Sequence, residues 1–120
     1  SSIVSHLAYS DFDSWLMADI ENPVENELLA RGLISKGELV KISHHGSKMS
    51  SSDSLLSAIS PLLAIISVGN NNRYGHPNQE TLNRLETHKI ETFRTDERGD
   101  IEVISNGKEF GYKTTKFKLL

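Results

Sequence analysis

Two adjacent histidines, His44 and His45, lie in the run SHHGS at residues 43–47, which holds the side chains of this sequence best suited to chemistry. The run follows a hydrophobic stretch that predicts a strand, and Asp19 follows an earlier stretch of the same kind. Imidazole and carboxylate groups are ligands that divalent cations accept. Because the chain has no cysteine, a metal could be held only by His, Asp or Glu. We therefore interpret Asp19, His44 and His45 as half of a metal site.

A cation held by these residues suits the hydrolysis of a phosphodiester. Metal-bound water loses a proton near neutral pH, and the cation offsets negative charge that develops on the phosphate oxygens. The hydroxyl of Ser47 and the backbone N–H groups of Gly46 and Ser47 are candidate donors to a phosphate oxygen. The candidate catalytic residues are Asp19, His45 and Ser47. The candidate substrate contacts are Ser47, His76, Lys48, Arg73 and Arg94.

Each candidate also has a purely structural interpretation. Asp19 stands shortly before Asn22 and Pro23, where an aspartate commonly forms a turn or caps a helix. Of two adjacent histidines, one can be buried and hydrogen-bonded while the other is exposed. His76, directly before a proline, is also suited to a helix cap. Asp96 is interpreted as a turn residue, and His6 and His88 as structural or surface residues. Tyr74 and Trp15 are interpreted as packing residues rather than as platforms on which a base stacks.

Strand and helix patterns alternate along the whole chain, which predicts a single α/β domain over residues 1–120. The predicted strands are 3–8, 14–18, 38–42, 63–68, 90–94 and 100–104, with a last extended segment at 109–117. The predicted helices are 23–31, a short helix after the cluster at 50–53, and one that opens at Pro77. The strand at 38–42 delivers the histidines to its carboxyl end, where ligands collect in open α/β sheets.

Local signals predict two further features. Asn22 is expected to cap the helix at 23–31, with Glu25 completing a capping box and Gly32 as the stop. The strands at 90–94 and 100–104 are expected to pair around a turn at 96–99.

Composition excludes some classes of protein. A net charge of −3 argues against a broad basic surface for nucleic acid, and the nearest approach to one is Lys113, Lys116 and Lys118. No stretch has the length and hydrophobicity of a membrane span, and the first residues do not resemble a secretion signal. A substrate such as DNA would therefore need a bound cation to supply part of the positive charge.

Five segments occur in a recognisable order: LMADIE at 16–21, VKISHHGS at 40–47, IISVGN at 65–70, YGHP at 74–77 and FRTD at 93–96. This ordered set resembles the C-terminal half of the metallo-β-lactamase-like domain in the ComEC competence (DNA internalisation) family, over roughly residues 3–107. The resemblance implies a partial αββα sandwich, with a mixed sheet and helices on one side of it. It also implies a hydrolase with one or two divalent metal ions, zinc or manganese, that degrades one DNA strand during uptake.

The resemblance also suggests residue roles. Asp19 matches the bridging carboxylate, His45 matches the last metal histidine with His44 as its rival, and His76 and Asp96 match positions near the site. The chain departs from the pattern at Ala18, where relatives usually have glycine. The family's upstream histidine cluster, of the type His-x-His-x-Asp-His, is absent, so fewer than the three protein ligands typical of catalytic zinc are present. We therefore expect little catalysis from this chain alone.

Three functions stay open at this level. The first is a DNA phosphodiesterase or nuclease, the second a hydrolase of the same fold acting on a small ester or lactone, and the third a non-catalytic α/β interaction module. The expected partners are single-stranded DNA, the rest of the hydrolase domain, and a second copy of the chain through exposed surface. The parent is expected to be a bacterial membrane protein, anchored by other domains, with this domain outside the cytoplasm.

Overall fold

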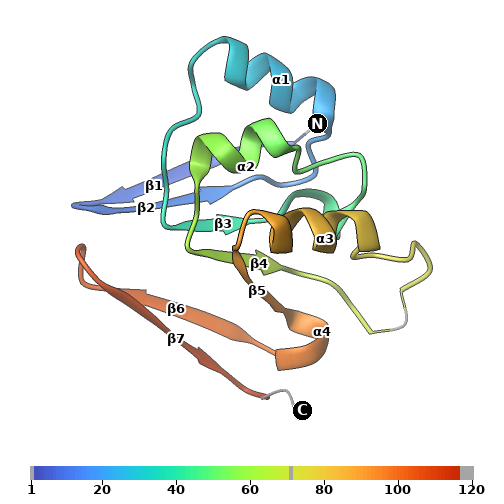
Figure 1. Ribbon diagram of the computed structural model, residues 1–120. Helices are drawn as coiled ribbons and strands as arrows, with labels where there is room; N and C mark the ends of the chain where they lie inside the picture. Colours follow the sequence, from blue (N-terminus) through green and yellow to red (C-terminus); the bar gives the residue numbers. More distant parts are fainter. Residues whose placement is uncertain (1, 71, 117–120) are drawn as a thin grey trace.

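The architecture follows from three crossover helices that link parallel strands (Figure 1). The computed structural model describes residues 2–70 and 72–116. The elements in chain order are β1 (Ser5–Tyr9), β2 (Phe12–Leu16), α1 (Asn22–Ala30), β3 (Leu39–Lys41), the 3-10 turn η1 (Ser43–Gly46), α2 (Asp53–Ile59), β4 (Leu63–Ile66), α3 (Gln79–Thr87), β5 (Glu91–Arg94), α4 (Thr95–Arg98), β6 (Ile101–Ser105) and β7 (Phe110–Thr114).

Five strands form the main sheet in the order β1-β2-β3-β4-β5. β1 is antiparallel to β2, and the other neighbours are parallel, so Trp15 pairs with Val40 and Val40 with Ala64. Parallel neighbours require a crossover, and α1, α2 and α3 supply the three that are needed. As a result, the segments after β2, β3, β4 and β5 all leave the sheet at the same edge.

The two faces of this sheet are covered differently. Helices α1, α2 and α3 lie on one face, and the β6–β7 hairpin lies on the other (Figure 1). The helix side buries a large apolar cluster that includes Met17, Val40, Ile42, Leu55, Leu56, Ile59, Ile66 and Leu85. The hairpin side buries a smaller one: Phe12, Leu39, Leu63 and Phe93, with Ile101, Val103 and Phe110 against it. The expected fold class is confirmed, since a mixed sheet with helices on one side is compatible with a partial αββα sandwich.

The pairing expected for the strands at 90–94 and 100–104 is wrong. β5 pairs in parallel with β4, α4 follows it, and β6 pairs with β7 instead. The physical reason is burial: β4 is apolar along its length and needs a neighbour on both sides, whereas β6 alternates between partly buried and exposed positions. Lys118 and residue 117 of the last predicted segment lie outside the described residues.

The capping box expected at the start of α1 is also wrong. Glu21, not Asn22, is the cap residue, and its side chain makes no capping hydrogen bond. The carboxylate of Glu25 is fully buried, where it accepts the backbone N–H of Ser51 at 2.5 Å and of Ser52 at 3.0 Å. Glu25 therefore ties α1 to the start of α2, a contact between residues far apart in the sequence.

The start of α2 agrees with the sequence, whereas α3 begins at Gln79, two residues after the expected Pro77, and His76 is not its cap. Ser52 caps α2 by accepting the N–H of Leu55, and Asn78 caps α3 by accepting the N–H of Glu80. Among the described residues, no helix is both long enough and apolar enough to cross a lipid bilayer.

Candidate functional site at the carboxyl edge of the sheet

The chain turns sharply after β2, at Ala18 and Asp19. Ala18 has a φ of +54°, in the left-handed region that favours glycine. Its carbonyl accepts the backbone N–H of His44 at 2.8 Å. This hydrogen bond joins the turn after β2 to the turn after β3, so the two segments expected to carry metal ligands are neighbours.

The histidine turn itself has an unusual backbone. His44, His45 and Gly46 have φ values of +49°, +54° and +83° in succession. A β carbon at Gly46 would lie 2.6 Å from the β carbon of Pro77, and the Gly46 carbonyl accepts the N–H of Asn78 at 2.9 Å. Glycine is therefore needed at position 46, because the segment before α3 approaches it closely. His44 and His45 are non-glycine residues at positive φ, a conformation that often marks functional sites.

His45 is oriented by one strong hydrogen bond. Its Nδ1 lies 2.6 Å from the carbonyl oxygen of Ser67, just after β4. A carbonyl oxygen can only accept, so the proton is on Nδ1 and the lone pair of Nε2 is free. Metal-ligating histidines characteristically donate their other ring N–H in this way, which fixes the tautomer and the ring orientation.

His44 lies beside a carboxylate that the sequence analysis did not select. Its Nδ1 is buried without a hydrogen bond and lies 3.5 Å from Oε2 of Glu21. The ring centroid of His44 is 6.3 Å from that of His45 and 5.5 Å from that of His76. The only sequence signal for Glu21 was its place in the LMADIE segment, two residues after Asp19.

Asp19 is exposed, and in the described part of the chain no hydrogen bond or ion pair joins it to a histidine. It lines a hollow of about 550 Å³ with Glu21, Ile20, Ser2, Pro23 and Val24. Within residues 2–70 and 72–116, no group of three or more His, Asp or Glu is gathered closely enough to hold a metal ion. Two ligands that share a zinc ion lie ~3–4 Å apart, a spacing that Glu21 and His44 have here.

Ser47 is buried and engaged in the local fold. Its Oγ accepts the N–H of Met49, and its carbonyl accepts the hydroxyl of Thr81 at 3.0 Å. The backbone N–H of Ser47 donates to the carbonyl of His44 at 3.0 Å. The expected role of Ser47 as a phosphate donor stays a prediction, and the residue visibly holds the histidine turn against α3.

Two residues expected to contact the substrate differ in whether their side chains are available to a ligand. Lys48 is exposed next to the histidine turn. Arg94, at the end of β5, makes a bidentate pair with Asp96, from Nε to Oδ1 at 2.9 Å and from Nη2 to Oδ2 at 2.6 Å. This hydrogen bond to Asp96 raises the pKa of Arg94 further above its already high value. Within the described part of the chain no ion pair engages Lys48, so it is available to a ligand, whereas Arg94 is held by Asp96.

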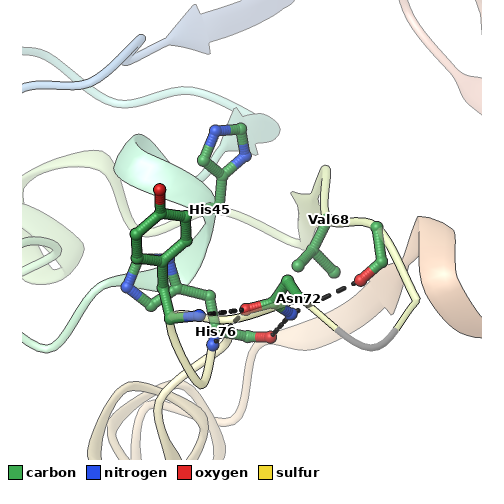
Figure 2. Close-up of a pocket in the computed structure, with 6 residues that line it drawn as sticks. His45, Val68, Asn72 and His76 are labelled. Carbon is green, nitrogen blue, oxygen red and sulfur yellow. Dashed lines mark hydrogen bonds between the residues drawn. The ribbon is translucent and has the colours of Figure 1, made fainter.

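A pocket of about 190 Å³ adjoins His45 (Figure 2). It is lined by His45, Val68, Gly69, Asn72, Tyr74 and His76. The interpretation of Tyr74 as a packing residue is wrong, since its side chain is 80% exposed, whereas Trp15 is 4% exposed and packs in the core as expected.

Asn72 holds the loop that carries Tyr74 and His76, as the dashed lines of Figure 2 show. Its Oδ1 accepts the N–H of Tyr74 at 3.2 Å and of His76 at 2.9 Å, and its Nδ2 donates to the His76 carbonyl. Desolvation, together with the nearby His44 and His45 rings, lowers the pKa of His76. His44, His45 and His76 thus form one histidine cluster, in which the ring of His76 is neutral near pH 7.

Comparison with known proteins relates this chain to competence proteins. It is 40% identical over 90 residues to ComE operon protein 3 of Bacillus subtilis, a match that covers 74% of this chain and 12% of that protein. It is 35% identical over 85 residues to Competence protein ComA of Neisseria gonorrhoeae, and 34% identical over 79 residues to Recombination protein 2 of Haemophilus influenzae.

These two matches cover 70% and 66% of the chain. The chain spans 10–12% of the length of these three relatives. No protein-family model matches it. The chain is thus similar to one short segment of each of these three longer proteins, one of which is named a competence protein.

Proposed function

We propose that this chain is the C-terminal part of a metal-dependent hydrolase domain of the metallo-β-lactamase-like kind, which cleaves DNA during its uptake. The relation to competence proteins supports a role in DNA uptake. The observation that carries the hydrolytic part of the proposal is the orientation of His45. Its Nδ1–H is committed to Ser67, so its Nε2 lone pair is free at the carboxyl edge of the sheet.

The donor atoms at this edge fit part of a metal shell. His45 offers Nε2, His44 has a buried Nδ1 without a hydrogen bond, and Glu21 and Asp19 supply carboxylates from the adjacent turn. Nitrogen and oxygen ligands of this kind suit zinc or manganese. The remaining ligands would come from a segment of the parent protein that packs on this edge, which is why the isolated chain is expected to be inactive.

When bound, such a metal would supply an activated water and a positive charge opposite the phosphate. The chain's own residues would orient the metal ligand and contact the substrate. The hydrogen bond to Ser67 keeps the imidazole of His45 in one tautomer and one orientation. Lys48, exposed beside the turn, would contact a phosphate oxygen of the DNA.

The test is DNA cleavage by the full-length protein that carries this chain, with zinc or manganese and an end-labelled single strand. We expect His45→Ala and Asp19→Ala each to reduce cleavage by about 10- to 100-fold or more, because each removes a metal ligand. His88→Gln is the matched control, since His88 lies at the far end of α3 and pairs with Asp53. Cleavage unchanged in both site variants would overturn the proposal.

Two other outcomes would point to the alternative functions. Turnover of small esters or lactones without DNA cleavage would indicate a small-molecule hydrolase of the same fold. Cleavage of neither substrate, with no change in thermal stability on addition of metal, would indicate a non-catalytic module. In the proposed arrangement the parent is a membrane protein that carries this domain outside the cytoplasm.

A further inference from the structure

The pocket beside His45 presents an aromatic surface that is left exposed by the residues the structure describes. The ring of Tyr74 is 80% exposed, and its centroid lies 5.9 Å from that of His76 with the two planes 30° apart. Val68 adds an apolar wall, and a β carbon at Gly69 would meet no atom within 4 Å. The rings of Tyr74 and His76 thus both line the pocket, with that of Tyr74 largely exposed.

The polar side chain of this loop already forms hydrogen bonds within the loop. The side-chain amide of Asn72 bonds to the backbone of Tyr74 and His76, so it holds the loop and is not free to read a ligand. A ligand in the pocket would therefore be held by stacking and apolar contact more than by hydrogen bonds. The volume of about 190 Å³ is below the ~300 Å³ at which sites for drug-sized ligands begin, and it suits one flat ring system.

The position of the pocket indicates what this ring is attached to. His45 lines the pocket. It also lies beside His44 and Glu21 at the carboxyl edge of the sheet, and we call these three residues the strand-end cluster. A ligand that places a flat ring in the pocket and a phosphate at the cluster has the composition of a nucleotide. Because the chain carries a net charge of −3, its affinity for a polyanion cannot rest on a broad basic surface and needs a contribution from contacts that are not ionic.

From this geometry we infer that the pocket binds one unpaired nucleobase by stacking on Tyr74 and His76, and thereby sets the adjacent phosphodiester beside His45. A base in a duplex has both faces covered, so the pocket selects single-stranded DNA or a frayed end. Stacking is available to all four bases, so recognition is indifferent to sequence. The inference rests on the proposed function, because it supplies the substrate contact of the same site.

The test uses this chain without metal, so that binding is measured apart from cleavage. The probe is hexathymidylate, and the comparison ligand is a chain of six abasic deoxyribose phosphates with the same charges and no bases. Binding is followed by NMR chemical-shift changes. We expect wild type to prefer hexathymidylate over the abasic chain, and Tyr74→Ala to lose roughly 5- to 140-fold in affinity for hexathymidylate, the equivalent of the ~1–3 kcal/mol per stacked base.

Variants separate stacking from charge. Tyr74→Phe should keep the affinity because it keeps the ring, and Tyr74→Leu should lose it. Tyr9→Ala is the matched control, since Tyr9 is another exposed tyrosine, at the β1–β2 turn. Arg73→Ala should weaken both ligands equally and lower the salt dependence of binding, whereas Tyr74→Ala should leave the salt dependence unchanged.

The outcomes distinguish this inference from the proposed function. Equal affinity of wild type for the two ligands, no binding of hexathymidylate, or an unaffected Tyr74→Ala variant would overturn the nucleobase pocket, even if the full-length protein cleaves DNA. Loss of self-association in Tyr74→Ala, seen by sedimentation, with no effect on hexathymidylate would assign the ring to a protein contact and overturn it too. Stacking on Tyr74 in a protein that fails to cleave DNA would support the pocket and contradict the hydrolase.

Discussion

His45 donates its Nδ1–H to the carbonyl oxygen of Ser67 across 2.6 Å, which joins the turn after β3 to the end of β4. Because the acceptor is a backbone carbonyl, no side-chain substitution can remove it. The parallel pairing of β3 with β4 places this carbonyl and therefore sets the orientation of the ring. The contact decides which ring nitrogen of His45 can meet a metal ion.

This hydrogen bond predicts the tautomer of His45. In the metal-free chain near pH 8, we expect the proton to be on Nδ1, with Nε2 unprotonated. Long-range ¹H–¹⁵N correlation NMR distinguishes the two tautomers directly. His44, whose Nδ1 has no hydrogen bond, is the internal comparison and should not show the same single-tautomer pattern. A proton on Nε2 of His45 would contradict the proposed ligand atom.

Ala18→Gly should stabilise the chain. Ala18 has a φ of +54°, and a left-handed conformation costs an L-residue roughly 1–2 kcal/mol, part of which is cancelled by the greater freedom of glycine in the unfolded state. We expect the free energy of unfolding in urea to rise by about 0.5–1 kcal/mol. The control is Ala8→Gly in β1, a strand position where glycine should lower stability. A loss of stability in Ala18→Gly would show that the alanine methyl makes a contact worth more than the strain.

Glu25→Ala should destabilise the chain by about 2–4 kcal/mol. The change removes a fully buried carboxylate and leaves the backbone N–H groups of Ser51 and Ser52 without their acceptor. Chemical denaturation measures the loss. Glu27→Ala is the matched control on the same helix, because Glu27 is exposed and forms a surface pair with Arg31, so its loss should be within ~0.5 kcal/mol. Similar losses in both variants would contradict the tie between α1 and α2.

The pKa of His76 should be measurably below 6.5 in the metal-free chain. Desolvation is the largest cause, and repulsion from His44 and His45 adds to it, so His44→Gln and His45→Gln should each raise this pKa part of the way back. An NMR titration of the ring protons measures it. A pKa of His76 that does not respond to either substitution would contradict the histidine cluster.

The same shift has a consequence for stability. Since the folded-state pKa lies below the unfolded-state value, the unfolded chain binds more protons in the interval between the two. The contribution of His76 is therefore fully present above pH 6.5 and is lost as the pH falls from 6.5 through the folded-state pKa. In His76→Gln, this part of the pH dependence of unfolding should disappear.

The amino-acid sequence by itself determined most of the helices and strands and the positions of the candidate site residues along the chain. Alternating apolar runs predicted the strands, and Ser52 and Pro77 marked the approach to helices. The histidines were expected at the carboxyl end of a strand, where the structure has them. These features depend on neighbours within one or two turns of chain, and side-chain periodicity and turn chemistry therefore reveal them.

Only the tertiary structure decided which segments meet. The pairing of β5 with β4, the contact of Glu25 with Ser51, and the approach of Glu21 to His44 all join residues through the packing of crossover helices on the sheet. The sequence suggested Asp19 for the metal, whereas the fold places Oε2 of Glu21 3.5 Å from Nδ1 of His44. The exposure of Tyr74 likewise follows from how Asn72 folds its loop, which no local pattern reports.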